Sequence, residues 1–235
     1  MKSGFVSIVG KPNVGKSSIL NAIIGQKVSI VTPKNQTTRN SIQGIYNDDD
    51  SQIIFIDTPG IHKPISELGT KMDKESYSSI RDCELSLFVV DASKPFNDGD
   101  QYLFDHLKFD CPLIVVFNKI DLTNIELIND LKKRYDDFYH PLAIIETSAV
   151  EKFGINDLIK CIKENLEEGP QYFDVETITN RDLAFRVQEI VREKLLLLLK
   201  EEVPHSSAVV CQEIKGSKSG LDIFAKIVVE KDGQK

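Results

Sequence analysis

Residues 10–17 decide the fold of this chain, and they read Gly10-Lys11-Pro12-Asn13-Val14-Gly15-Lys16-Ser17. An apolar stretch that predicts a strand, Phe5–Val9, precedes them, and a helical pattern, Ser17–Ile24, follows. The two glycines let backbone N–H groups converge on an anion where a Cβ would obstruct, and the helix directs its positive end to the same point. The stretch therefore predicts a phosphate-binding loop, although a glycine-rich turn remains an alternative for this motif taken alone.

Outward from this loop, apolar strand patterns alternate with helical patterns as far as residue 168. The predicted strands are Phe5–Val9, Ser41–Tyr46, Gln52–Ile56, Leu85–Val90, Leu113–Phe117 and Leu142–Glu146. The predicted helices are Ser17–Ile24, Gly69–Asp82, Gln101–Leu107, Asn124–Asp137 and Ile155–Asn165. Nearly continuous apolar strands between helices are typical of parallel strands that are covered on both faces. We therefore expect an α/β domain with a doubly wound, mostly parallel six-stranded sheet.

The last quarter of the chain predicts a second, smaller unit. Gly169-Pro170 ends the last helix of the first domain, so we place domain boundaries at 1–168, 169–181 (linker) and 182–235. The helical pattern Asp182–Glu202, ended by Pro204, precedes two strand patterns, Ser207–Glu213 and Asp222–Val229. One helix over two strands buries little apolar surface and would be marginally stable alone.

Three further motifs follow the phosphate loop in order: Thr37-Thr38, Asp57-Thr58-Pro59-Gly60 and Asn118-Lys119-Ile120-Asp121. Together the four motifs predict a site for GTP and Mg²⁺. In such a site Lys16 bridges the β- and γ-phosphates, while Ser17 and Asp57 face the metal. A threonine of the second motif supplies another metal ligand, and we favour Thr38 over Thr37. The predicted metal ligands are thus Ser17, Thr38 and Asp57, and the predicted catalytic groups are Lys16, Thr38 and the Gly60 amide.

The guanine base is expected to be recognised by the motif at 118–121. The Asp121 carboxylate accepts hydrogen bonds from N1–H and from the exocyclic amine of guanine, and adenine offers neither donor there. In Thr147-Ser148-Ala149, after the next strand, the Ala149 amide is expected to meet guanine O6. The complete set of predicted nucleotide-binding residues is Gly10, Lys11, Pro12, Asn13, Val14, Gly15, Lys16, Ser17, Ser18, Asp57, Thr58, Pro59, Gly60, Asn118, Lys119, Asp121, Ser148 and Ala149.

The hydrolytic step is less clearly marked. Many switch GTPases place a glutamine directly after the glycine of the third motif to orient the attacking water. Here Ile61 stands in that place and offers no hydrogen bond, and His62, which follows, is better interpreted as a solvated loop residue. The sequence therefore predicts slow intrinsic turnover that needs help from another group.

Composition is typical of a soluble globular protein, with 235 residues, 41% hydrophobic and 28% charged. Residues 1–180 carry 19 basic and 27 acidic side chains, which argues against a broad grip on nucleic acid there, whereas residues 181–235 carry 10 and 9. Four dispersed cysteines without a Cys-x-x-Cys pair suggest a reducing compartment and buried free thiols. No export signal or membrane span is predicted, so we expect a cytoplasmic protein. We also expect it to be a monomer.

These motifs, with Gln36-Thr37-Thr38-Arg39, the Ile61-His62 extension, the stretch 185–195 and the stretch 228–235, resemble the Era family of bacterial GTPases along the whole chain. The resemblance implies a KH-type second domain that binds the 3′ end of 16S rRNA and serves 30S maturation. It also implies peripheral association with the cytoplasmic membrane. The family carries its Gly-x-x-Gly RNA clamp just after the position of Lys235, so we expect residues 182–235 to be the first half of that domain in a truncated chain.

The resemblance also implies that Asn13 binds K⁺ beside the phosphates, where the cation would offset developing charge; an ordinary loop residue is the alternative. The leading hypothesis for function is a GTP-hydrolysing ribosome-assembly factor. The alternatives are an adaptor with GTP- and GDP-bound shapes and negligible turnover, or another ribosome- or tRNA-linked GTPase of the same superfamily. The guanine motif argues against an ATPase or a P-loop kinase.

Overall fold

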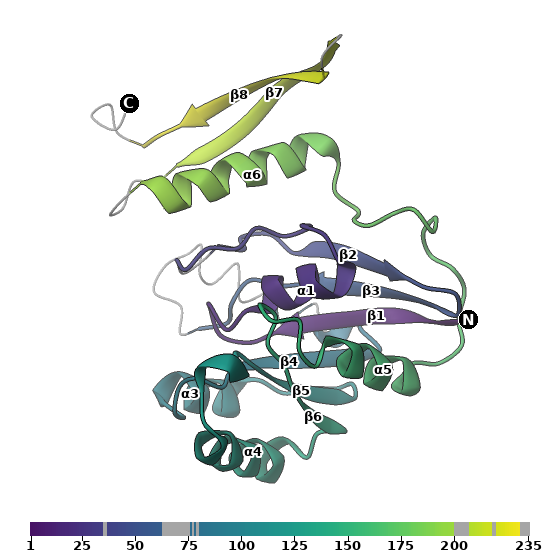
Figure 1. Ribbon diagram of the computed structural model, residues 1–235, viewed down its shortest axis with the longest axis vertical. Helices are drawn as coiled ribbons and strands as arrows, with labels where there is room; N and C mark the ends of the chain where they lie inside the picture. Colours follow the sequence, from purple (N-terminus) through teal and green to yellow (C-terminus); the bar gives the residue numbers. More distant parts are fainter. Residues whose placement is uncertain are drawn as a thin grey trace. The chain divides into compact units, whose positions relative to one another are not determined.

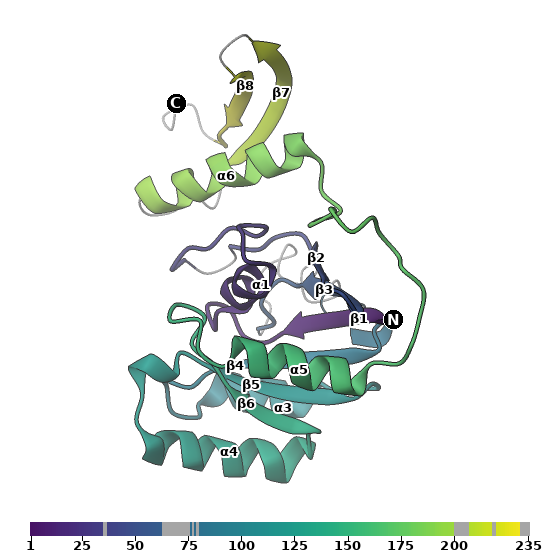
Figure 2. The ribbon, with the colours of Figure 1, turned by 45° about the vertical axis from the view of Figure 1, so that its right-hand side comes forward.

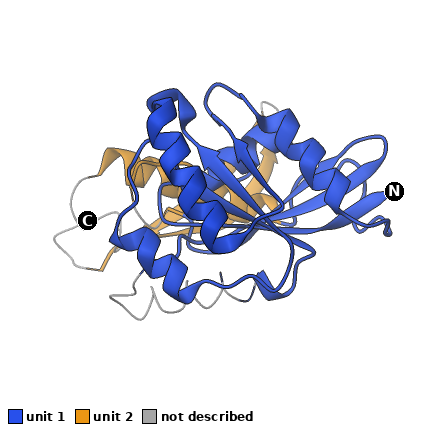
Figure 3. Cartoon of the chain, turned by 90° about the horizontal axis from the view of Figure 1, so that it is seen from below, with its two compact units in different colours: residues 1–29, 38–180 blue, residues 30–37, 181–235 orange. Residues whose placement is uncertain are grey.

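The computed structural model describes residues 1–34, 37–62, 76, 78, 80–199, 207–217 and 220–230. The chain forms two compact units, which Figure 3 colours separately. The first contains residues 1–29 and 38–180, and the second contains residues 30–37 and 181–235. The segment 30–37, which precedes Thr38, therefore belongs to the same unit as the C-terminal residues. The residues directly before and after it in the chain belong to the first unit.

The first unit is built on a six-stranded sheet with the order β2-β3-β1-β4-β5-β6, as can be followed in Figure 1. Only the β2–β3 pair is antiparallel. This arrangement confirms the predicted fold class. The strands are β1 (Lys2–Val9), β2 (Ile42–Asn47), β3 (Ser51–Asp57), β4 (Leu85–Asp91), β5 (Leu113–Asn118) and β6 (Ala143–Glu146).

Helices cover both faces of this sheet (Figure 2). Apolar side chains of α1 and α5, such as Leu20 and Leu158, pack in one buried cluster, and those of α3 and α4, such as Leu103 and Tyr135, pack in another. Both faces of β4 and β5 are therefore buried, which is why these strands are almost entirely apolar. The helices are α1 (Lys16–Ile24), α3 (Asp98–His106), α4 (Ile125–Tyr139) and α5 (Ile155–Asn165).

Two helix predictions of the first unit need comment. The helix expected at Gln101–Leu107 begins three residues earlier, because the Asn97 side chain accepts from the Gly99 amide and the Asp100 side chain accepts from the Asn97 amide. The predicted helix 69–82 lies largely outside the described residues; residues 76, 78, 80 and 81 within it are helical.

The end of the predicted linker is held along the edge strand β2. The Ile45 amide donates to the Ile178 carbonyl at 2.9 Å, and Gly44 forms a β-bridge with Thr179. The Gln52 side chain also accepts from the amides of Tyr172 and Phe173. Residues 172–179 are thus held on the sheet by backbone and side-chain hydrogen bonds, and a freely moving tether does not describe them.

The second unit contains α6 (Leu183–Leu198) and a hairpin of β7 (Ala208–Ser217) and β8 (Gly220–Val228). The Asp182 side chain caps α6 by accepting from the Phe185 amide at 2.8 Å. The prediction that this helix reaches Glu202 was wrong at its end: Leu199 is extended, and residues 200–206 lie outside the described residues. The hairpin strands pair further toward their turn than expected, because Lys215 pairs with Asp222 and Ser217 with Gly220.

Polar contacts join segment 30–37 to α6 inside the second unit. The Arg192 guanidinium donates from Nη2 to the Thr37 carbonyl at 2.6 Å, and the Glu193 carboxylate accepts from the Val31 amide at 3.1 Å. The Lys34 ammonium donates to the Leu199 carbonyl at 2.5 Å. Arg192 and Glu193 are only 5% and 3% exposed, so two charged side chains that would ordinarily face water are buried against this segment.

Candidate functional site

The predicted site residues stand at or just after the carboxyl ends of the parallel strands, and these strands run in the same direction across the sheet in Figure 1. The loop 10–15 follows β1, Asp57 ends β3, Asn118 ends β5 and Thr147 follows β6. Since β1 lies between β3 and β4, the strand order reverses here, and such a switch point at the carboxyl ends of the strands is where open α/β sheets bind ligands.

The phosphate loop has a backbone that its glycines make possible. Gly10 and Gly15 have φ angles of 146° and 101°, in the region that side chains other than glycine avoid. A Cβ at Gly10 would lie 2.3 Å from the Val89 carbonyl oxygen, and one at Gly15 would lie 2.1 Å from Nδ2 of Asn118. Asn13 has a φ of 62°, which asparagine tolerates better than most residues. The loop is thus shaped for backbone N–H groups to face an anion.

Lys16, at the start of α1, points its ammonium back into this loop. Its Nζ donates to the carbonyls of Gly10 at 3.1 Å and Lys11 at 2.9 Å. Burial lowers the pKa of Lys16 from 10.5 to about 8, and the nearby Asp57 carboxylate opposes this shift. Carbonyl partners compensate only part of the charge of a buried ammonium, so an incoming phosphate would stabilise it.

We expect the Lys16→Met variant to be more stable than the parent without nucleotide while losing GTP affinity. The lowered pKa amounts to roughly 3 kcal/mol against the charged form, and two lost hydrogen bonds return about 1 kcal/mol each. A gain of about 1 kcal/mol remains. The folded state binds fewer protons than the unfolded state between pH 8 and 10.5, so the gain is largest below pH 8 and disappears toward pH 10.5. Urea denaturation across this range measures it.

Lys108→Met, at an exposed lysine, is the matched control and should change neither stability nor affinity appreciably. A Lys16→Met variant that is less stable than the parent at pH 7 would contradict the electrostatic argument.

Three oxygen-bearing side chains lie together beside Lys16. The Ser17 hydroxyl donates to Oδ2 of Asp57 at 2.6 Å and lies 3.1 Å from the Thr38 hydroxyl. Ser29, which the sequence did not single out, donates to the same Asp57 oxygen at 2.8 Å. Within the described residues, Oδ1 of Asp57 is buried without a hydrogen-bond partner. Burial raises the pKa of Asp57, although Ser17, Lys16 and Ser29 oppose the shift.

These oxygens fit a hard divalent cation. Mg²⁺ prefers oxygen ligands and usually keeps several waters, so a buried carboxylate oxygen that lacks a partner suits a water-mediated contact. The two threonines differ here: the Thr38 hydroxyl faces Ser17, whereas the Thr37 hydroxyl donates to the Lys34 carbonyl at 2.7 Å. This difference supports the preference for Thr38.

The loop after β3 lies against the phosphate loop. A Cβ at Gly60 would come within 2.6 Å of Pro12 backbone atoms, so glycine is required for this approach. Thr58 donates to the Ile8 carbonyl at 2.8 Å, and Pro59 accepts from Ser76. Ile61 is fully buried and its amide donates to the Gly10 carbonyl at 3.1 Å, so its side chain does not face the site as a water-orienting group would.

Asn118 and Lys119 brace the phosphate loop from the next strand. The Asn118 side chain donates to the Val14 carbonyl at 3.0 Å and accepts from the Ala149 amide at 3.1 Å. The Lys119 ammonium donates to the Asn13 carbonyl at 2.6 Å and pairs with Asp91 at 2.7 Å. Asp91 was missed in the sequence, although an aspartate at the end of an apolar strand is the same signal that marks Asp57.

The residues predicted to read the base are arranged differently from one another. Asp121 is exposed in the short 3₁₀ helix Ile120–Leu122, and its carboxylate has no hydrogen bond or ion pair to any described residue. Ser148 is buried, and its hydroxyl accepts from the Glu151 amide at 3.2 Å. Since the Ala149 amide already donates to Asn118, guanine O6 would have to share this donor. Lys11, Pro12 and Ser18 are partly exposed around the loop.

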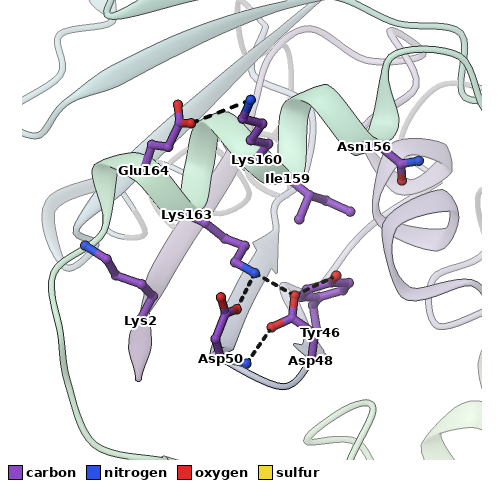
Figure 4. A pocket seen from close by; sticks show the side chains of 9 residues that line it. All are labelled: Lys2, Tyr46, Asp48, Asp50, Asn156, Ile159, Lys160, Lys163 and Glu164. Atoms are coloured by element: carbon purple, nitrogen blue, oxygen red, sulfur yellow. Dashed lines mark hydrogen bonds and ion pairs between the residues drawn. The ribbon is translucent and has the colours of Figure 1, made fainter.

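A groove of about 490 Å³ lies elsewhere, between α5 and the β2–β3 hairpin (Figure 4). Lys163 bridges Asp48, at 2.9 Å, and Asp50 across it. Although burial opposes the shift, hydrogen bonds from Ser51, Lys163 and Tyr46 hold the pKa of Asp48 well below its usual range. Lys2, Lys160 and Glu164 also line the groove, so its three basic and three acidic side chains balance. We therefore interpret the groove as a polar contact between the hairpin and α5.

Comparison with known proteins extends over the whole chain. The sequence profile of the family described as "50S ribosome-binding GTPase" matches residues 5–119. The chain is 45% identical to GTPase Era of Thermosipho melanesiensis over 238 residues, which is all of this chain and 80% of that protein. It is 46% identical to GTPase Era of Lactobacillus delbrueckii subsp. bulgaricus over 236 residues, which is all of this chain and 78% of that protein.

Solved structures give the same result. The crystal structure of a variant of Aquifex aeolicus Era bound to GDP·AlF4⁻ has a TM-score of 0.90 and 37% identity, and the match covers 99% of this chain and 81% of that one. The structure of Era with MgGDPNP and nucleotides 1506–1542 of 16S ribosomal RNA also has a TM-score of 0.90 and 37% identity, covering 99% and 80%.

Proposed function

Because this chain belongs to the Era family of GTPases and is itself a GTPase, we propose that its nucleotide cycle controls an assembly step of the small ribosomal subunit through the 3′ end of 16S rRNA. The observation that supports this proposal is the likeness, over nearly the whole chain, to an Era structure that holds both a GTP analogue and that RNA. An adaptor without turnover is not favoured, since an Era relative also binds GDP·AlF4⁻.

Each chemical role is assigned to groups that already lie together. The loop 10–15 and Lys16 would bind the β- and γ-phosphates, and the Gly60 amide would sense the γ-phosphate through its approach to Pro12. Ser17, Thr38 and Asp57 would hold Mg²⁺, which neutralises phosphate charge when bound. Asp121 would select guanine. Since the buried Ile61 side chain cannot orient water, turnover by the chain alone would be slow.

The second unit is where we place the response to nucleotide. Thr38 is directly bonded to Thr37, whose carbonyl accepts from Arg192 of α6. A metal that pulls on the Thr38 hydroxyl would therefore act on a segment that is anchored to the helix of the predicted RNA-binding, KH-type unit, residues 182–235. Arg192 and Glu193 would carry the coupling.

Fluorescence anisotropy with an oligonucleotide matching nucleotides 1506–1542 tests the RNA assignment. We expect tighter binding in the presence of a non-hydrolysable GTP analogue than in the presence of GDP, and weak binding of a scrambled oligonucleotide. Equal affinity for both oligonucleotides in both nucleotide states would refute the proposed RNA-directed switch.

The Arg192→Ala variant should loosen segment 30–37. It removes a charge-assisted hydrogen bond worth about 1.5–3 kcal/mol, so amide exchange at Val31 and Thr37 should accelerate roughly tenfold or more. Hydrogen exchange followed by mass spectrometry measures this. Arg186→Ala, on the same helix, is the control, because the Arg186 side chain has no hydrogen bond or ion pair among the described residues. Equal exchange in both variants would remove Arg192 from the coupling.

The K⁺ site at Asn13 is a further proposal. If the side chain binds K⁺, Asn13→Gly should abolish the acceleration of GTP hydrolysis by K⁺ over Na⁺, since glycine keeps the positive φ of this position but removes the ligand. Steady-state phosphate release in the two salts measures it. A parent that hydrolyses equally in both salts, or a variant that keeps the K⁺ response, would support the alternative that Asn13 serves loop conformation alone.

Peripheral association with the cytoplasmic membrane remains a prediction from the family resemblance. A monomeric state and action in the cytoplasm remain predictions as well. Among the described residues, no helix is long and apolar enough to cross a membrane. Cosedimentation with anionic vesicles and light scattering would measure the two properties.

A further inference from the structure

Two cysteines lie side by side at the end of the sheet where β4 and β5 begin, opposite the end with the predicted nucleotide site. Cys83 stands two residues before β4, and Cys111 stands two residues before β5. Their Sγ atoms are 3.5 Å apart. The strands that follow are paired in parallel, with Ser86 opposite Leu113, and the Ser86 amide donates to the Pro112 carbonyl at 2.9 Å. The backbones on both sides are thus already held at neighbouring-strand distance.

A small polar cluster surrounds the two sulfur atoms. The hydroxyls of Ser7 and Ser86, both fully buried, are 2.7 Å apart. Cys83 contacts the Ser7 hydroxyl at 3.4 Å, and Cys111 contacts the Ser86 hydroxyl at 3.1 Å. In this arrangement the Cys83 thiol donates to Ser7, whereas the Ser86 hydroxyl can donate to either sulfur. A hydroxyl that donates to sulfur favours the thiolate, which is the reactive form. This cluster is unlike the apolar surroundings of a structural cysteine.

We propose that Cys83 and Cys111 are a redox-active thiol pair that a peroxide oxidises to an intramolecular disulfide. The Cys83 thiolate attacks one peroxide oxygen, the O–O bond breaks, and a sulfenic acid and one water form. The Cys111 sulfur then attacks the Cys83 sulfur and displaces the hydroxyl group as a second water. Two thiols lose two electrons and two protons in total, and the peroxide is reduced to two waters.

Cys83 is the expected first nucleophile. Its hydrogen bond with Cys111, together with those of Ser7 and Ser86, lowers the pKa of Cys83 to about 6, although burial opposes the shift. The same contact with Cys83 raises the pKa of Cys111, so the pair divides into an attacking and a resolving thiol. Burial raises the pKa of Cys161, which makes it a poor nucleophile.

The other cysteines provide internal controls. All four are free and partly exposed, which corrects the expectation of buried thiols. Exposure therefore does not distinguish Cys83 and Cys111 from Cys161 and Cys211, whereas their mutual distance and their contacts with Ser7 and Ser86 do. Among the described residues, no group of three or more His, Cys, Asp or Glu side chains could hold a metal ion, so the pair is better suited to oxidation than to metal binding.

Peptide mapping of the whole chain after treatment with hydrogen peroxide tests the proposal. We expect one cross-linked peptide that joins Cys83 to Cys111, two hydrogens lighter than the reduced pair and cleaved by dithiothreitol. Cys161 and Cys211 should remain available to an alkylating reagent. Oxidation of these two cysteines at the same rate as the pair, or no cross-link at all, would overturn the assignment.

Two variants separate the roles of the thiols. Cys111→Ser should trap the sulfenic acid on Cys83, detected as a dimedone adduct, whereas Cys161→Ser should behave as the parent. Before any peroxide is added, Cys83 should be alkylated roughly tenfold or more faster than Cys161 at pH 7. Retained GDP binding shows that each variant is folded. A folded Cys111→Ser variant without an adduct on Cys83 would refute the proposed order of attack.

Discussion

Replacing Asp121 by asparagine is expected to lower the affinity for GTP and GDP by roughly 10³–10⁴-fold, because the site then loses the carboxylate that we propose accepts two hydrogen bonds from guanine. The amide has one acceptor oxygen and brings an NH₂ group against the N1–H and amine donors of the base. Xanthine has a carbonyl in place of that amine, so the variant should gain affinity for xanthosine diphosphate. Isothermal titration calorimetry with both diphosphates measures the exchange.

In this variant a loss of affinity can be separated from a loss of stability. Asp121 is exposed and its carboxylate has no hydrogen bond or ion pair to any described residue, so the substitution should change stability very little. Asp137→Asn, at an exposed position of α4, is the matched control for the loss of one negative charge. Affinity for GDP that stays within about tenfold of the parent would show that Asp121 does not read the base.

The second large effect is expected for Gly15→Ala, which should abolish nucleotide binding and lower the free energy of unfolding by about 3 kcal/mol or more. The new methyl group would lie 2.1 Å from Nδ2 of Asn118. That side chain cannot simply turn away, because it bonds the Val14 carbonyl and the Ala149 amide. One methyl group would therefore disturb the phosphate loop and the base-binding loops together.

Gly25→Ala provides the comparison for Gly15→Ala. Gly25 also has a positive φ, 77°, but a Cβ there would meet no atom within 4 Å. Its cost should be conformational strain alone, about 1 kcal/mol, with GDP affinity unchanged. Urea denaturation and calorimetry on both variants distinguish strain from collision. Equal losses in the two variants would contradict the role of the Asn118 contact.

At Asn118 and Thr38 the folded chain assigns roles that the sequence motifs leave open. The motif 118–121 was predicted from its spacing, but its first residue contacts the phosphate loop and the Ala149 amide, and within the motif Asp121 is left open for the base. The threonine pair could not be separated by sequence, because both residues carry the same hydroxyl. Folding separates them, since Thr38 faces Ser17 while Thr37 turns to Lys34.

By itself the sequence predicted the α/β class, which the structure confirms, and it marked the end of the sheet and the carboxylate that we propose for nucleotide binding and guanine recognition. These predictions depend on motifs that directly follow strands. Parallel strands place their carboxyl ends on the same side of a sheet, irrespective of the loops that connect them. Tertiary structure alone decided that residues 30–37 join α6 through Arg192 and Glu193, and that Cys83 meets Cys111. These contacts link residues separated by 28 positions or by more than 150, and no local pattern records such pairings.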